Sequence, residues 1–237
     1  MLDKLIKEPF LGFQPEALKF LKALTNPKNN NKLWFDEHRD KYENYLKQPM
    51  RGLIDTLAVE VNKIDPDIVI NYKSIFRINR DVRFSKNKAP YKNLYSAAFA
   101  FERVKSSEIP QFYFHFDPKQ FIFASGQYSM DSDYLKKIRS AISKDFKTYK
   151  SLITKKNFVK TYGKVEGEVL SNLPRGFDNL DINKCDPVLI QSLKMKQFYV
   201  GKTYKPEVIL SEEVVDIITE NIKQSYDFTK FLHDATK

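Results

Sequence analysis

The chain has 237 residues, of which 42% are hydrophobic and 14% aromatic, so it can bury a sizeable core and is not expected to be disordered. Its 40 Lys and Arg residues outnumber 30 Asp and Glu residues, and the formal net charge of +10 favours anionic partners such as nucleic acid or phosphorylated metabolites. No signal peptide and no membrane span are visible, and the single Cys185 excludes an internal disulfide, so we expect a cytoplasmic protein.

The first third of the sequence predicts three helices separated by prolines. The first begins at Pro15, which suits an early helical position, and ends before Pro27. The second begins after the asparagines at 29–31, whose side chains can cap a helix, and runs up to Pro49; the third ends before Pro66. Residues at helical spacing form the inward faces of the three helices: Ala17, Leu18, Leu21 and Leu24; Phe35, His38, Tyr42, Tyr45 and Leu46; Leu53, Ile54, Leu57, Val61 and Ile64.

The middle of the sequence alternates with a period of about two residues, which is typical of β-strands. Phenylalanines alternate with other residues over 112–116 and again at 121 and 123, after a turn at Asp117-Pro118. A third candidate strand covers 93–101. Short connections favour an antiparallel meander, because parallel strands need long crossovers.

Helical patterns return in the last part of the sequence. Asp131 and Asp133 predict the start of a helix that continues to residue 150, and its outward arc carries Lys136, Lys137, Arg139, Lys144, Lys147 and Lys150. A strand is expected over 197–204, and a final helix begins at Ser211. This order predicts an α+β fold, an antiparallel sheet packed with N-terminal and C-terminal helices, in a single domain of residues 1–237.

The stretch INRDVRFSKNKAPYK, at 78–92, concentrates positive charge. If residues 76–85 are extended, Phe76, Ile78, Arg80, Val82 and Phe84 share one face of the chain. The other face then carries Arg77, Asn79, Asp81, Arg83 and Ser85, and its planar guanidinium groups suit a phosphate or a carboxylate. Lys88, Tyr91 and Lys92 follow in a predicted loop, so the candidate ligand-binding residues are Arg77, Arg80, Asp81, Arg83, Ser85, Lys88, Tyr91 and Lys92. The alternative is an Arg–Asp network that only fixes the strand and loop.

Three blocks of the sequence carry a family resemblance. They are FQPEALKFLKAL, NNNKLWFDEHRDKYE and RINRDVRFSKNKAPYK, and looser similarity extends through ASGQYSMDSDYLKKIR and NLPRGF. The third block is the most specific, and it resembles the R-D-x-R-F-S-K-D-K-x-P-Y-K segment of a widespread uncharacterised family, domain of unknown function 2461. The resemblance implies a single α+β domain and no particular reaction.

Two positions depart from the pattern of that family. Asn87 stands where Asp is common, and ASG at 124–126 lacks the usual paired glycines. If the family's acid at that position were a general base, this chain would be impaired.

Several other chemistries are disfavoured by the sequence. His38, His115 and His233 have no His or Cys at metal-ligand spacing, so no metal site is expected. His115 and Asp117 could form a base and its orienting acid on one strand face, but a solvated sheet face is the favoured interpretation. No G-x-G-x-x-G or G-x-x-x-x-G-K loop occurs, so no nucleotide cofactor is expected.

Three functional hypotheses follow from these patterns. The first is a binding site or enzyme for a small molecule bearing phosphate or carboxylate, built on the Arg/Lys/Tyr cluster of 77–92. The second is a non-catalytic scaffold or protein-interaction domain. The third is nucleic-acid binding through the basic face of 136–164. Whether a bond is made or broken stays open in the first hypothesis, and the oligomeric state stays open in all three.

Overall fold

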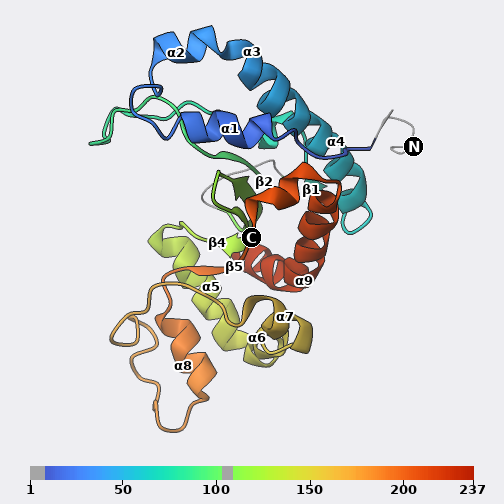
Figure 1. Cartoon of the computed structure of the whole chain (residues 1–237). Helices are drawn as coiled ribbons and strands as arrows, with labels where there is room; N and C mark the ends of the chain where they lie inside the picture. The colour runs from blue at the N-terminus through green and yellow to red at the C-terminus, as the bar shows by residue number, and fades with distance from the viewer. Residues whose placement is uncertain (1–8, 103–108) are drawn as a thin grey trace. The chain divides into compact units, whose positions relative to one another are not determined.

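A computed structural model describes residues 9–102 and 109–237 of the chain (Figure 1). Its helices are Glu16–Ala23 (α1), Lys32–Glu37 (α2), Arg39–Tyr42 (α3), Gln48–Asn62 (α4), Ser132–Lys144 (α5), Phe146–Ile153 (α6), Lys156–Tyr162 (α7), Pro187–Lys194 (α8) and Glu213–Thr236 (α9). Its strands are Ile68–Val69 (β1), Tyr95–Phe101 (β2), Gln111–Phe116 (β3), Phe121–Gln127 (β4) and Phe198–Tyr204 (β5). A π-helical turn covers Glu43–Lys47, and short 3₁₀ turns cover Tyr72–Ser74 and Pro206–Leu210.

The strands form one antiparallel sheet in the order β1-β2-β3-β4-β5. Strand order therefore follows chain order, and β1 pairs with β2 so that Ile68 lies opposite Phe101. The predicted α+β class and antiparallel meander are confirmed, and the strand expected over 197–204 is β5. The sequence did not predict β1, which is only two residues long.

The chain divides into two compact units. The first unit contains the described residues of Met1–Val104, Tyr113–Phe123 and Thr203–Asn221, and the second those of Lys105–Phe112, Ala124–Lys202 and Ile222–Lys237. Strands β3, β4 and β5 and helix α9 each contribute residues to both units. The single domain expected for residues 1–237 stays a prediction.

We expect the whole chain to unfold in one cooperative transition. Unfolding of either unit would disrupt β3, β4, β5 and α9, and these elements also contribute residues to the other unit. The chain offers one reporter in each unit: its only tryptophan, Trp34, and its only cysteine, Cys185, which can carry a fluorescent label. Urea unfolding curves from the two reporters should share one midpoint. Two separated midpoints would show that the units unfold independently.

Aromatic side chains build the core of the first unit. Phe116 of β3 lies 4.8 Å from Phe13 and 6.3 Å from Tyr95, measured between ring centroids. Every residue of β2 is buried, because small side chains such as Ala98 face one side while Phe99 faces the other. In β3 the buried residues alternate with half-buried ones, as the sequence predicts.

The predicted boundary at Pro49 is wrong. The Gln48 N–H donates to the Glu43 carbonyl across the π-helical turn, and the chain continues directly into α4. Pro49 lies in the first turn of α4, where a missing N–H is tolerated. The predicted cap at the start of α2 is confirmed, since the Asn31 side chain accepts a 3.0 Å hydrogen bond from the Trp34 N–H.

The second unit differs from the prediction at Asp145. Asp131 caps α5 as expected, but the helix predicted to reach residue 150 ends at Lys144. Asp145 then accepts a hydrogen bond from the Thr148 N–H and begins α6. Arg139, predicted to face solvent, is only 7% exposed, because its guanidinium donates to the Met195 carbonyl at 2.8 Å.

Helices α7 and α8 were not predicted, whereas α9 begins close to the expected position. The core of the second unit includes Ile138, Ile142, Tyr149, Phe158, Phe198 and Phe228. None of the helices in the described part of the chain is both long and apolar enough to cross a membrane.

Candidate functional site

Residues 76–92 form two extended arms joined by a loop. The arms meet at an antiparallel bridge between Asn79 and Tyr91. Beside the bridge, the Arg80 N–H donates to the Pro90 carbonyl at 2.8 Å. This backbone pairing fixes the positions of the Cα atoms from which the side chains of the two arms extend.

The extended conformation predicted for 76–85 ends at Val82. There the chain turns, and the Ser85 N–H donates to the Val82 carbonyl at 3.3 Å. The turn breaks the alternation of faces, so Phe84, predicted to lie on the apolar face, is 96% exposed. The Arg83 guanidinium lies 5.9 Å from the centroid of the Phe84 ring.

Asn30 anchors the second arm. Its side-chain oxygen accepts from the Tyr91 N–H at 3.0 Å, and its amide donates to the carbonyls of Tyr91, at 3.0 Å, and Leu24, at 2.9 Å. The Tyr91 ring is stacked on Phe35 with centroids 4.0 Å apart. Tyr91, predicted as a ligand-binding residue, is only 6% exposed, and its ring and backbone hold the arm in place.

Three of the predicted cations do not converge. Arg83 pairs with Asp81 through Nη2 and Oδ2 at 2.7 Å, and this hydrogen bond lowers the pKa of the Asp81 carboxyl. The Lys88 ammonium donates to the Val82 carbonyl at 3.0 Å, and Arg77 is exposed. This part of the cluster has the geometry of the Arg–Asp network that the sequence left as an alternative.

Arg80 and Lys92 are different, because both are half-buried. The Arg80 guanidinium donates to the Ala89 carbonyl at 3.1 Å and to the Ser85 hydroxyl at 3.3 Å. The Lys92 ammonium donates to the Arg77 carbonyl at 3.0 Å, and burial, then the charge of Arg77, lowers the pKa of Lys92. Among the described residues, neither cation has a carboxylate within ion-pair distance.

Two hollows lie beside these cations. One, which we name the Phe76 hollow, has a volume of about 460 Å³ and is lined by Phe76, Arg80, Asp81, Lys92, Leu94, Ser96 and Tyr113. The other, which we name the Asn30 hollow, has a volume of about 440 Å³, and its lining includes Asn30, Arg80, Asn87, Ala89, Tyr91, Lys92 and Leu94. Arg80, Lys92 and Leu94 therefore line both hollows.

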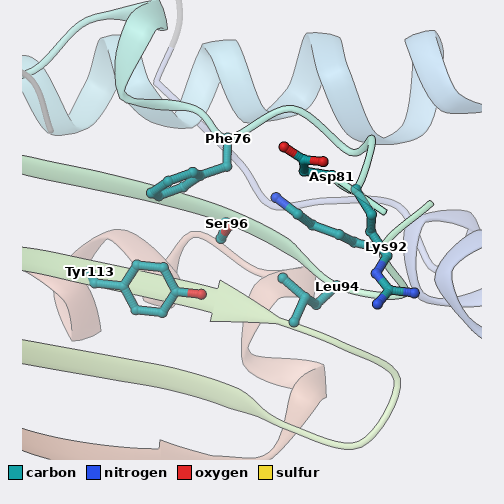
Figure 2. A pocket seen from close by; sticks show the side chains of 7 residues that line it. Phe76, Asp81, Lys92, Leu94, Ser96 and Tyr113 are labelled. Atoms are coloured by element: carbon teal, nitrogen blue, oxygen red, sulfur yellow. The ribbon is translucent and has the colours of Figure 1, made fainter. Parts of the chain in front are cut away.

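Hydroxyl groups from two strands line the Phe76 hollow. Figure 2 shows Phe76, Asp81 and Lys92 on one side, facing Ser96 of β2 and Tyr113 of β3. Burial raises the pKa of Tyr113, and a hydrogen bond with Ser96 only partly opposes this effect. The Tyr113 hydroxyl is therefore neutral near pH 7 and can donate a hydrogen bond.

The sequence did not predict Phe76, Leu94, Ser96 or Tyr113 as lining residues. Ser96 and Tyr113 lie on strands, and their pattern indicates a sheet face rather than a site. The alternation of tyrosine and histidine with phenylalanine in β3 was the one available signal.

His115 lies two residues beyond Tyr113 on the same face of β3. Its Nδ1 atom is buried and has no hydrogen-bond partner in the described part of the chain. Asp117 does not orient it: the Asp117 carboxylate accepts instead from the backbone N–H groups of Lys119, at 2.6 Å, and Gln120, at 3.1 Å. Burial lowers the pKa of His115, and the negative charge of Asp117 only partly opposes this effect.

This shift makes stability depend on pH. Because the folded pKa of His115 lies below the ordinary value of 6.5, the unfolded chain binds the proton more readily. The contribution of neutral His115 to the free energy of unfolding is complete above pH 6.5, and it is lost as the pH falls towards the lower pKa of the folded state. We expect His115→Gln to reduce the loss of unfolding free energy between pH 7 and pH 5, by at most about 1.4 kcal/mol per pH unit. Urea unfolding at several pH values measures this, and parallel curves for the two proteins would contradict it.

The basic region of 136–164 is partly neutralised. Lys150 pairs with Asp186 at 2.5 Å, and Lys155 pairs with Asp227 at 3.3 Å. The exposed lysines without such a partner among the described residues are Lys136, Lys144, Lys147, Lys156, Lys160 and Lys164. Within 9–102 and 109–237, no group of three or more His, Cys, Asp or Glu side chains is placed to hold a metal ion.

Comparison with known proteins gives a family and nothing closer. A family model described as "Conserved hypothetical protein (DUF2461)" matches residues 16–231, from α1 into α9. No curated protein and no solved structure matches the chain. The matched range includes both arms of 76–92 and both hollows.

Proposed function

The chain belongs to this family of conserved hypothetical proteins, which has no assigned activity, and from that premise we propose that it binds a small molecule bearing a phosphate or carboxylate group. One observation carries the proposal. Arg80 and Lys92 are half-buried beside two hollows, and neither has a carboxylate partner among the described residues.

Partial burial of a cation removes water from it, and that cost is offset only by hydrogen bonds and opposite charge. Carbonyl oxygens accept hydrogen bonds from Arg80 and Lys92, but they carry no full negative charge and therefore offset only part of the cost of burial. A bound phosphate or carboxylate would supply the missing negative charge through charge-assisted hydrogen bonds. The net charge of +10 also raises the local concentration of anions.

The proposal covers binding rather than a reaction. Asp81 is the only acid among the residues lining the Phe76 hollow, and Arg83 already holds its carboxylate. The lining of the Asn30 hollow contains no acid. These surroundings favour retention of an anion over proton transfer.

Lys92→Met is expected to weaken binding of inorganic phosphate about tenfold or more, because a hydrogen bond to a charged group contributes about 1.5–3 kcal/mol. Lys86→Met is the matched control: it removes the same charge from an exposed position in the loop that joins the two arms. Isothermal titration at low salt measures both. Equal weakening by the two variants would assign the effect to surface charge, and no phosphate binding by the unaltered protein would remove the proposal.

Nucleic-acid binding is a second candidate, favoured by the six exposed lysines between residues 136 and 164 that have no carboxylate partner among the described residues. It requires affinity for an oligonucleotide that falls steeply with salt, and no retention at low ionic strength would remove it. We place either activity in the cytoplasm, since the free thiol of Cys185 suits a reducing compartment.

A further inference from the structure

The charged ends of Arg80 and Lys92 contact different walls of the two hollows. The Lys92 ammonium is 5.5 Å from the centroid of the Phe76 ring, which lines the Phe76 hollow alone. The Arg80 guanidinium is 3.1 Å from the carbonyl of Ala89, which lines the Asn30 hollow alone. Both residues line both hollows, and these contacts place the Lys92 ammonium beside a wall of the Phe76 hollow and the Arg80 guanidinium beside a wall of the Asn30 hollow.

We propose that the site takes a molecule with two anionic groups, such as a bisphosphate, a dicarboxylate or a phosphorylated carboxylic acid, with one anionic group in each hollow. This inference rests on the proposed function and makes it more specific. A molecule with one anionic group would compensate only one of the two cations.

The Phe76 hollow suits an anionic group joined to an apolar linker. The Lys92 ammonium, the hydroxyls of Ser96 and Tyr113, and the Asp81 carboxylate that Arg83 holds are polar groups of the lining (Figure 2). Phe76 and Leu94 supply an apolar wall, and Leu94 continues into the lining of the Asn30 hollow. A short hydrocarbon linker can therefore contact Leu94 while it connects the two anionic groups.

The Asn30 hollow suits the second anionic group. A guanidinium has five N–H donors, and the described contacts of Arg80 occupy only two of its nitrogens. Asn87 contributes an amide whose oxygen accepts from the Ala89 N–H at 2.9 Å. Because none of the lining residues is acidic, no carboxylate in this hollow competes with an incoming anion for Arg80.

The two cations are also held at a fixed spacing. Arg80 and Lys92 lie on paired arms, and the Lys92 N–H donates to the Ile78 carbonyl at 2.8 Å. Asn30 holds the backbone of Tyr91, the residue before Lys92. Because the spacing is set before binding, the second anionic group of a two-headed ligand binds at a high effective concentration.

The test compares propyl phosphate with the bisphosphates of propane-1,3-diol and hexane-1,6-diol, by isothermal titration at constant ionic strength. We expect two propyl phosphates per chain but only one bisphosphate, and at least one bisphosphate should bind ten times or more tightly. Butyrate and glutarate, compared in the same way, show whether the anionic groups are carboxylates rather than phosphates.

Two variants locate the sites. Lys92→Met and Arg80→Gln should each leave one propyl phosphate per chain and remove the advantage of the bisphosphate, whereas Lys86→Met should preserve both. Glutamine at residue 80 retains an N–H donor for the Ala89 carbonyl, and Arg80→Lys, which retains the charge, should restore the second site in part. Circular dichroism melting curves confirm that each variant is folded.

The outcomes separate this inference from the proposed function. If one propyl phosphate binds per chain, and neither bisphosphate nor glutarate binds more tightly than its counterpart with one anionic group, the proposal of a ligand with two anionic groups is wrong. The proposed binding of a single anion then still stands. An advantage that survives in both variants also overturns the ligand with two anionic groups. If none of these anions binds, both proposals are wrong.

Discussion

Asn30→Ala is expected to lower the free energy of unfolding by about 3 kcal/mol and to weaken phosphate binding about tenfold. The alanine removes the partner of three backbone groups: the N–H and the carbonyl of Tyr91 and the carbonyl of Leu24. Asn30 itself is 9% exposed, so water replaces these bonds poorly, and each unpaired buried group costs about 1–3 kcal/mol. Without this anchor the arm that carries Lys92 loses its position, which is why binding falls together with stability.

The neighbouring asparagines are matched controls, since all three variants make the same chemical change. Asn31→Ala removes the cap of α2, which is worth about 1 kcal/mol, and an exposed 2.8 Å hydrogen bond from the Asn31 amide to the Lys28 carbonyl; it should leave phosphate binding unchanged. Asn29 makes one hydrogen bond, to the Ala23 carbonyl at 3.1 Å, so Asn29→Ala should cost least. Urea unfolding measures the free energy of unfolding of each variant, and isothermal titration measures its affinity for phosphate. Equal losses for Asn30→Ala and Asn31→Ala would contradict the anchoring role.

Gly126→Ala is expected to cost at least about 3 kcal/mol. Gly126 has a φ angle of +112°, which side chains rarely adopt and which alone costs about 1–3 kcal/mol. A Cβ at this position would also lie 2.3 Å from the Phe198 carbonyl oxygen and 3.0 Å from the Tyr199 Cα. Both atoms belong to the backbone of β5, so the clash is relieved only by moving a strand.

Gly163→Ala separates the two contributions. Gly163 also has a positive φ, +75°, but no atom lies within 4 Å of a Cβ added there. The destabilisation caused by Gly163→Ala should therefore be the backbone strain alone, roughly 1–3 kcal/mol. Thermal unfolding followed by circular dichroism measures both variants. A Gly126→Ala protein as stable as Gly163→Ala would show that β5 can move away at little cost.

The features of the fold that the sequence predicted correctly are local. Asn31 and Asp131 cap helices that begin within three residues of them, and the alternation of phenylalanines in β3 depends on adjacent residues. The break at Asp145 escaped prediction because apolar residues keep helical spacing on both sides of it. Arg139 was misplaced because its partner, the Met195 carbonyl, lies far along the sequence.

The candidate site was predicted by region and not by geometry. Charge density identifies 77–92, but the turn at Val82 decides that Arg83 pairs with Asp81 while Arg80 stays beside the hollows. This turn is closed by one 3.3 Å backbone hydrogen bond, and its two central residues, Arg83 and Phe84, are not among the usual turn residues that would have predicted it. Ser96 and Tyr113 join the site only through the pairing of distant segments, and a single sequence does not contain that information.

The π-helical turn at Glu43–Lys47 limits which chain lengths this part of the protein tolerates. It contains one residue more than a regular helical turn needs. Deleting one residue there would merge α3 and α4 into a regular helix and rotate everything before it by about 100° around the helix axis. Asn30 would then turn away from Tyr91, so a relative with a one-residue gap at this position would need a different anchor for the binding segment.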